Sequence, residues 1–128
     1  FIVALIVALV FGLGYLVKLC RRLLPLLAGE RRYPRFAYLA ALDRLSEVGR
    51  ERRRGESRER HGERLASDLP SLPALTRGHL ARAFGSPTAP DTKTFRQLVG
   101  ALSTELRRLP LARRLLGLLD PYSWLRTR

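Results

Sequence analysis

The sequence predicts an all-α protein: one N-terminal transmembrane helix, then a small cytoplasmic helical bundle and a C-terminal amphipathic helix. Three observations predict this class. Residues 1–17 are apolar without a charge, apolar residues then recur at helical spacing, and no segment alternates over a useful length as a strand does. The predicted organisation is a transmembrane helix over 1–19, a basic juxtamembrane segment over 20–35, a helical domain over 36–109 and an amphipathic tail over 110–128.

The first segment, FIVALIVALVFGLGYLV, determines the predicted compartment. At about 1.5 Å per residue it covers roughly 25 Å, close to the ~30 Å hydrocarbon core of a bilayer. Lys18, Arg21 and Arg22 follow at once, so the positive-inside rule places the later residues in the cytoplasm, at the inner membrane. A secretory signal peptide, with its charges before the apolar stretch, and a buried core helix are the alternatives that this pattern disfavours.

Smaller features refine this segment. Gly12 and Gly14 permit close approach of another helix, although their spacing is not that of a standard packing motif. The stretch from Leu23 to Ala28 is interrupted by Pro25, so it either lies at the interface or continues the helix with a kink. The chain has no methionine. We therefore expect a processed chain or a fragment whose apolar helix is truncated at its N-terminus.

The charge balance is strongly basic, with 24 Lys+Arg against 11 Asp+Glu and a formal net charge of +13. Such an excess favours anionic partners, which are lipid headgroups, nucleic acid or acidic proteins. Many of the arginines between residues 50 and 64 alternate with glutamates, and no recognition helix or stacking motif accompanies them, which disfavours nucleic acid. Anionic lipid is favoured, because a membrane helix holds the domain near the leaflet, where each Lys or Arg adds ~1 kcal/mol.

The segment from residue 36 to residue 109 is predicted to form three or four short helices. The first has an apolar residue at every third position and ends at Gly49: Phe36, Leu39, Leu42, Leu45 and Val48. The later helices begin at candidate N-cap residues, namely Ser57, Ser71, and Asp91 or Thr92. Their predicted apolar faces are His61, Leu65 and Leu69; Leu72, Leu75, His79, Leu80, Ala83 and Phe84; and Phe95, Leu98, Val99, Leu102, Leu106 and Leu109.

The tail over residues 110–128 has the composition of an interfacial helix. Its leucines are Leu111, Leu115, Leu116, Leu118 and Leu119, with Arg113 and Arg114 expected on the opposite side and Tyr122 and Trp124 following. Packing of this helix on the bundle is an alternative that the sequence leaves open. The candidate membrane-interface residues are therefore Lys18, Arg21, Arg22, Arg113, Arg114, Tyr122 and Trp124.

Catalytic chemistry is not indicated by the sequence. Cys20 lies among basic residues at the end of the apolar segment, which is compatible with a lowered thiol pKa, but a small residue at a helix end is the simpler interpretation. His61 and His79 lie on predicted core faces, and the single cysteine excludes an internal disulfide. No phosphate-binding glycine motif or cluster with metal-ligand spacing is present. We expect a chain that catalyses nothing itself and binds no cofactor or metal.

Taken in order, these segments resemble the C-terminal end of bacterial TgpA-type transglutaminase-like membrane proteins. The resemblance covers nearly the whole chain and rests on the membrane helix, the basic run after it and the stretch FAYLAALDRLSEVGRERRRGES. The family pattern there is a Leu-rich helix ending in Gly, a basic loop, Gly-Glu-Thr and an acidic residue. The corresponding positions here are Gly49, residues 50–54, Gly55, Glu56, Ser57 and Glu59, and a later aromatic-Gly pair is Phe84-Gly85.

The sequence departs from that pattern with Ser57 in place of Thr and Phe84 in place of Tyr, which keeps the expected roles of a helix cap and a buried aromatic. The resemblance implies a non-catalytic domain of unknown function that anchors or regulates an upstream transglutaminase-like enzyme, or docks a cytoplasmic protein. The implied partners are the lipid bilayer and the upstream domains of the same protein. The family's catalytic cysteine belongs to the upstream domain, and Cys20 does not correspond to it. A membrane-anchored basic module for anionic lipid is the alternative function.

Overall fold

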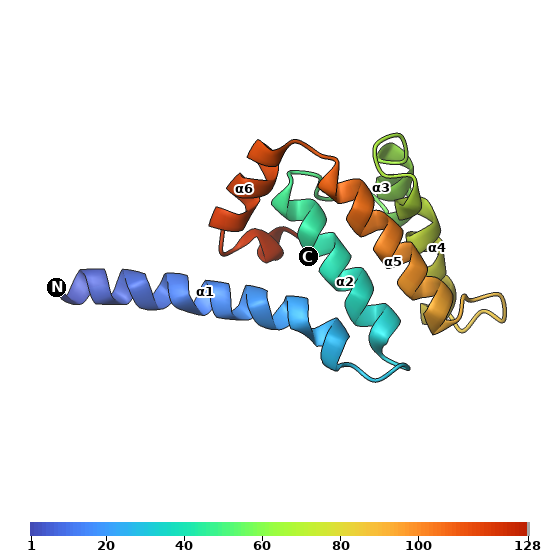
Figure 1. The fold of residues 1–128 in the computed structure, drawn as a ribbon, viewed down its shortest axis with the longest axis horizontal. Helices are drawn as coiled ribbons and strands as arrows, with labels where there is room; N and C mark the ends of the chain where they lie inside the picture. Colours follow the sequence, from blue (N-terminus) through green and yellow to red (C-terminus); the bar gives the residue numbers. More distant parts are fainter. Residues whose placement is uncertain (128) are drawn as a thin grey trace.

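The computed structural model describes residues 1–127, and throughout this range the chain is helical with loops and without strands. The all-α prediction is confirmed. The elements are α1 (Ile2–Leu27), α2 (Tyr33–Glu47), α3 (Arg58–Arg64), α4 (Ser71–Ala83), α5 (Thr92–Arg107), α6 (Leu111–Leu119) and the 3-10 helix η1 (Ser123–Thr127). Helix α1 extends away from a small bundle formed by the other helices, so the N-terminus is the most distant point of the molecule (Figure 1).

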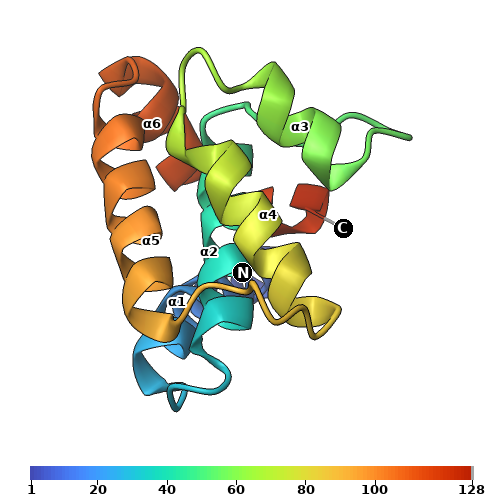
Figure 2. The same cartoon turned by 90° about the vertical axis from the view of Figure 1, so that its right-hand side faces the viewer.

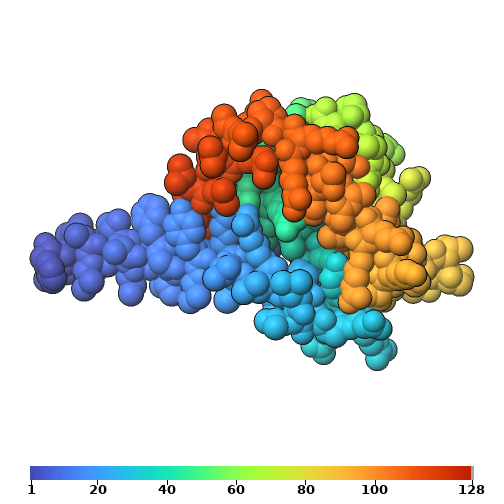
Figure 3. Space-filling model, viewed as in Figure 1, coloured from blue at the N-terminus to red at the C-terminus, as the bar shows by residue number. Residues whose placement is uncertain are grey.

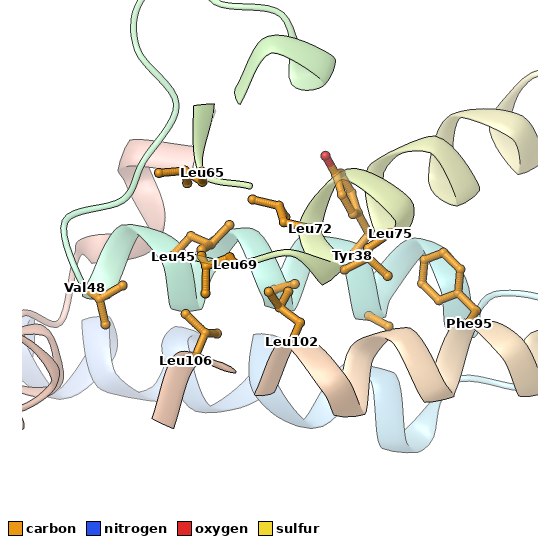
Figure 4. Packing of buried hydrophobic residues seen from close by; sticks show 12 residues of the cluster. Tyr38, Leu45, Val48, Leu65, Leu69, Leu72, Leu75, Phe95, Leu102 and Leu106 are labelled. Carbon is orange, nitrogen blue, oxygen red and sulfur yellow. The ribbon is translucent and has the colours of Figure 1, made fainter. Parts of the chain in front are cut away.

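Helix α2 lies at the centre of the bundle and contacts α1, α4, α5, α6 and η1. In the view rotated by 90°, α2 lies behind α4 and α5 (Figure 2). The apolar core fills the space between these three helices and the turn after α3 (Figure 4). Its largest fully buried side chains include Tyr38, Leu45, Leu65, Leu69, Leu72, Leu75, Phe95 and Leu102. Burial of each such side chain contributes about 1.5–3 kcal/mol.

The buried face of α2 differs from the prediction. Tyr38 and Ala41 are buried, whereas Phe36 and Leu39 are only half-buried. A strict three-residue repeat advances ~300° per step, so its members drift around the helix by about 60° each time. The repeat reaches the core only in its second half, where Leu42 packs against it and Leu45 and Val48 are buried. The predicted face of α5 is confirmed, because its residues are buried or packed against the core.

Helix ends follow local rules, with one exception. The Ser57 hydroxyl accepts a hydrogen bond from the Arg60 N–H at 3.2 Å, and an Asp91 carboxylate oxygen accepts one from the Thr94 N–H at 2.9 Å, so both predicted caps are confirmed. The prediction for Ser71 is wrong. Ser71 is the first residue of α4, and its N–H donates to the carboxylate of Glu105, 3.2 Å away. A side chain from α5 therefore caps α4 at its positive end.

The expectation that Phe84 is a buried aromatic is also wrong, because this side chain is 84% exposed. Phe84 ends α4, nine residues after the buried Leu75, which places it about half a turn from Leu75 around the helix. The chain then leaves the helix at Gly85, which has φ +68°. The predicted helix stop at Gly49 is confirmed, since its φ is +71° and the Arg50 N–H bonds back to the Leu45 carbonyl at 2.8 Å.

The N-terminal helix is longer than the predicted span of 1–19, and of the two arrangements left open for residues 23–28 the structure has the continued helix. Helix α1 continues to Leu27 with Pro25 inside it, so much of the predicted juxtamembrane segment over 20–35 is helical. The predicted tail over 110–128 contains α6 and η1, which fold back against α2, and its last residue, Arg128, lies outside the described residues.

Candidate functional site

The surface of α1 divides sharply into an uncovered apolar part and one covered stripe. Every large apolar side chain from Phe1 to Leu19 is exposed. Gly14 and Lys18 are the buried residues of α1, and Arg21 and Arg22 are half-buried. These four positions lie on one helix face at i, i+4, i+7 and i+8. The helix thus meets the bundle through a glycine and basic side chains, and is long and apolar enough to cross a membrane.

The basic stripe of α1 is paired with two carboxylates of α2. Arg21 donates to both oxygens of Asp43, at 2.7 and 2.9 Å. Lys18 lies 3.3 Å from Glu47, and Arg22 donates to the same carboxylate at 2.5 Å. We name these five residues the junction cluster. The side chains of Asp43 and Glu47 are each only 7% exposed, so the pairing offsets a substantial desolvation cost.

Burial raises the pKa of Asp43, and the hydrogen bonds and positive charge of Arg21 oppose this effect. Thr127 of η1 donates to the same carboxylate at 3.1 Å. Arg21 also lies over the ring of Trp124, with 5.3 Å from the guanidinium carbon to the ring centroid, a cation–π geometry. The junction cluster and its contacts therefore join three segments, which are the C-terminal half of α1, the last turns of α2 and the last turn of the described chain.

The C-terminal end of α6 is fixed by Lys18. The ammonium group donates to the carbonyls of Gly117 at 2.7 Å and Asp120 at 2.9 Å. Carbonyls at a helix C-terminus lack intrahelical partners and attract positive charge. Gly117 also permits the contact of α6 with α2, since a Cβ at this position would lie 2.0 Å from the Glu47 carbonyl oxygen.

The segment after α6 lies directly against the apolar part of α1. The Tyr122 hydroxyl donates to the Val10 carbonyl at 2.6 Å, and the Tyr15 hydroxyl donates to the Leu119 carbonyl at 2.9 Å. A Cβ on Gly14 would lie 3.0 Å from the Cβ of Pro121. The close approach foreseen for the two glycines thus occurs at Gly14, with a loop segment as the neighbour, while Gly12 faces open space.

Helix α6 leaves its leucines uncovered. The exposed fractions are 68% for Leu111, 55% for Leu115, 68% for Leu116, 46% for Leu118 and 70% for Leu119. Of the two predicted basic residues, Arg113 is exposed. Arg114 is not on the opposite side, because it borders a cavity together with Leu111, Leu115 and Leu118. Helix α6 therefore contacts the bundle through a narrow edge at Gly117 and presents an apolar surface outward.

The residues of the motif around Gly55 form the loop that leads into α3. Gly55 has φ +77°, and the Glu56 carboxylate accepts two hydrogen bonds from Arg64, at 2.7 and 3.0 Å. This guanidinium holds the pKa of Glu56 at about 2. Glu59 is exposed in the first turn of α3. The arginine-rich loop is thus partly neutralised by its own glutamates.

The two histidines and the cysteine were the remaining candidates for catalytic or metal-binding chemistry. His61 is buried and its Nε2 lies 2.8 Å from the Arg50 carbonyl oxygen. His79 stacks on Tyr38 with 4.1 Å between ring centroids, and burial, with the nearby Arg58 and Arg35, lowers its pKa to about 4. Cys20 is exposed. Among residues 1–127, no group of three His, Cys, Asp or Glu side chains is arranged to hold a metal.

Sequence reasoning missed the two acidic members of the junction cluster. Asp43 and Glu47 are the two acidic residues of α2 and lie four residues apart, and this spacing matches basic residues at i, i+3 and i+4 on α1. The matching spacing of these acidic and basic residues could therefore have predicted their pairing. Comparisons with protein-family models, with curated proteins and with solved structures find no match for this chain.

Proposed function

We propose that the chain is a non-catalytic module that anchors a cytoplasmic helical domain to the inner membrane and holds it in a fixed orientation. The observation that carries this proposal is the division of α1. Its large apolar side chains from Phe1 to Leu19 are exposed, while its glycine and basic stripe is occupied by the bundle and the segment after α6. Lipid is the solvent that such a surface requires.

The fixed orientation follows from how the junction is built. A helix attached only through a loop turns freely. In the junction cluster, by contrast, Lys18, Arg21 and Arg22 of α1 each form a charge pair with α2. Tyr15 and Lys18 hold the C-terminal end of α6 at the last apolar turn of α1. The exposed leucines of α6 would therefore lie at the membrane interface, as amphipathic helices do.

The distribution of basic residues supports placement of the bundle on the cytoplasmic side of the membrane. Lys18, Arg21 and Arg22 follow the apolar segment, and Arg31, Arg32 and Arg35 come soon after. Positive residues near a membrane helix are retained on the cytoplasmic side. Proteolysis of vesicles tests this, because the exposed arginines of the loop over residues 50–54 are trypsin sites. We expect cleavage in inverted vesicles and protection in intact right-side-out vesicles, whereas the reverse pattern would refute the orientation.

Membrane integration is tested separately by extraction with alkaline carbonate. The wild-type chain should stay in the membrane fraction. Leu9→Arg places a charge on the uncovered face, at a cost of about 2.5–3.5 kcal/mol near a helix centre, and should release much of the chain. Leu9→Ile is the matched control, which should behave as wild type. Release of the wild-type chain would contradict the proposal.

We further propose that this module is the C-terminal part of a TgpA-type transglutaminase-like membrane protein, where it regulates the enzyme or docks a cytoplasmic protein. The sequence resemblance supports this, and Gly49, Gly55 and Ser57 have the turn and capping roles that the resemblance implies. The test is the coding DNA before Phe1. An open frame that encodes further membrane segments and a domain with Cys, His and Asp would support the proposal, and a start codon a few residues upstream would exclude it.

A further inference from the structure

A cleft of about 280 Å³ opens where α1, α2, α5 and α6 meet. Figure 3 shows it as the hollow in which α2 (green) appears between α1 (blue) and the orange helices α5 and α6. Four arginines from four different helices line it: Arg22, Arg44, Arg107 and Arg114. Leucines of α6 form an adjoining wall: Leu111, Leu115 and Leu118. The cleft thus combines a concentrated positive charge with an apolar side.

The positive charge of the cleft is only partly compensated. Glu47 is the one carboxylate in its lining, and it already pairs with Lys18 and Arg22. The Arg22 Nε and the Glu47 Oε1 are both buried and lack a hydrogen-bond partner among the described residues, so neither is open to the cleft. Arg44 donates to the Ser103 hydroxyl at 2.8 Å, and burial, together with the charge of Arg22, lowers its pKa. Arg114 donates to the Arg107 carbonyl at 3.3 Å. Four guanidinium groups thus face a single carboxylate, and a multiply charged oxyanion would supply the compensating charge.

The height of the cleft relative to the predicted membrane fits a phosphate group of a lipid. Arg22 is four residues beyond Lys18, which places it about 6 Å past the end of the apolar segment. The headgroup layer on each side of a bilayer is about 5–8 Å thick. The leucine wall belongs to α6, whose C-terminal end contacts α1 at Tyr15. An acyl chain that follows the exposed leucines would therefore run from the cleft toward the hydrocarbon core.

A second cavity of about 180 Å³ adjoins the cleft and shares Arg22, Arg44, Ser103 and Leu106 with it. The rest of its lining is mostly apolar and includes the small residues Ala37 and Ala40. The two cavities flank the same pair of arginines. Together they provide room for a headgroup and its glycerol on either side of that pair.

We propose that this cleft is a specific binding site for an anionic phospholipid, with the phosphate held by Arg22, Arg44, Arg107 and Arg114 and the acyl chains against the leucines of α6. The proposal rests on the proposed membrane anchoring. It deepens that function by naming the lipid class and by making the contact of the bundle with the membrane selective.

The test is lipid retention by the full chain, purified in detergent and examined by native mass spectrometry. The probes are phosphatidylglycerol, phosphatidylcholine and inorganic phosphate. The cleft variant is Arg44→Gln with Arg107→Gln, and a second variant carries Arg107→Gln alone, because this side chain is exposed and its removal should not disturb folding. The matched control removes the same charge elsewhere, with Arg54→Gln and Arg77→Gln.

We expect the wild-type chain and the matched control to retain phosphatidylglycerol over phosphatidylcholine. The double cleft variant should lose about tenfold or more of that retention, and Arg107→Gln alone should lose part of it. Equal retention of both lipids, equal loss in the control, or binding of inorganic phosphate without lipid would overturn the proposal. Carbonate extraction of the same variants keeps the two proposals apart, since membrane integration should be unchanged in all of them.

Discussion

The bundle and its junction with α1 are held together by opposite kinds of interaction. Between α2, α4 and α5 the contacts are apolar, and Leu45, Leu72 and Phe95 are fully buried. Between α1 and α2 the contacts are charge pairs, with side chains of Asp43 and Glu47 that are nearly as buried. The apolar core depends on shape and volume, whereas the junction depends on a few charges whose loss leaves their partners buried and unpaired.

This difference assigns separate roles to the two regions. We expect the core to determine whether the domain is folded, and the junction to determine how the folded domain is oriented relative to α1. The large exposed side chains of α1 from Phe1 to Leu19 are apolar, whereas polar pairing is directed toward the bundle, so one helix carries two distinct surfaces. Substitutions that affect only one region are therefore the direct way to test the comparison.

The largest effect is expected in the apolar core. Phe95→Ala removes a fully buried ring and should lower the free energy of unfolding by about 3–5 kcal/mol. Urea denaturation of the detergent-solubilised chain, followed by circular dichroism, measures this loss. Leu98→Ala, at a half-buried position of the same helix, should cost less. An equal loss at the two positions would contradict the assignment of the core.

A somewhat smaller effect is expected in the junction. Glu47→Gln leaves Lys18, which is 6% exposed, and Arg22 without their carboxylate, at a cost of about 3 kcal/mol. The consequence should be release of α6 and η1 from α1, seen as increased hydrogen exchange in residues 111–127 with the α5 amides still protected. Glu59→Gln, an exposed change of the same kind, is the control. Loss of protection throughout the bundle would show that the two regions are not separable.

A pH effect should act on the bundle through His79. Its pKa is lowered to about 4 in the folded chain and is ~6.5 when unfolded. Between these values the unfolded state binds a proton that the folded state does not, so stability is complete above pH 6.5 and falls toward pH 4. Because the ring is only half-buried, we expect a slope of about 1 kcal/mol per pH unit.

Denaturation at several pH values measures the slope for the wild type and for His79→Gln. The variant should have a shallower slope, and not a flat one, because burial lowers the pKa of His61 as well. An identical slope in both proteins would rule out His79 as a source of the pH dependence.

The smallest predicted effect concerns the loop between α2 and α3. Ser57→Ala removes the side-chain acceptor for the Arg60 N–H and should cost about 1 kcal/mol of stability. Ser67→Ala, in an exposed turn, provides the comparison and should be close to neutral. If the melting curve of Ser57→Ala matched that of wild type, the capping role would be refuted.

What the sequence predicted correctly depends on local rules. The helical class, the stop at Gly49, the caps at Ser57 and Asp91 and the buried face of α5 each follow from a few neighbouring residues. Where local signals were ambiguous, the prediction failed. The three-residue repeat of α2 drifts around the helix and does not include the buried Tyr38, and Phe84 lies on the side of α4 opposite to the buried Leu75.

The candidate site was less predictable because it is made of contacts between distant segments. Lys18 and Arg21 were singled out for their position next to the apolar segment, but their pairing with Asp43 and Glu47 depends on how α1 lies on α2. Ser71 was an equally good cap candidate by local rules, yet Glu105, 34 residues away, performs that role. The sequence left open whether the C-terminal helix packs on the bundle or lies at the membrane interface. Its contact with α2 is possible because Gly117 has no side chain that would collide with Glu47.

In the membrane we expect residues 119–122 to stay against the apolar part of α1, as they do in the structure. Disulfide formation tests it most directly, in a Cys20→Ser background. The pair Gly14→Cys and Pro121→Cys should crosslink readily in membranes, since the Cβ positions are 3.0 Å apart and a small adjustment gives disulfide geometry. The pair Gly12→Cys and Pro121→Cys should not, because Gly12 faces open space. Failure of the first pair, or equal crosslinking of both, would contradict the docked arrangement.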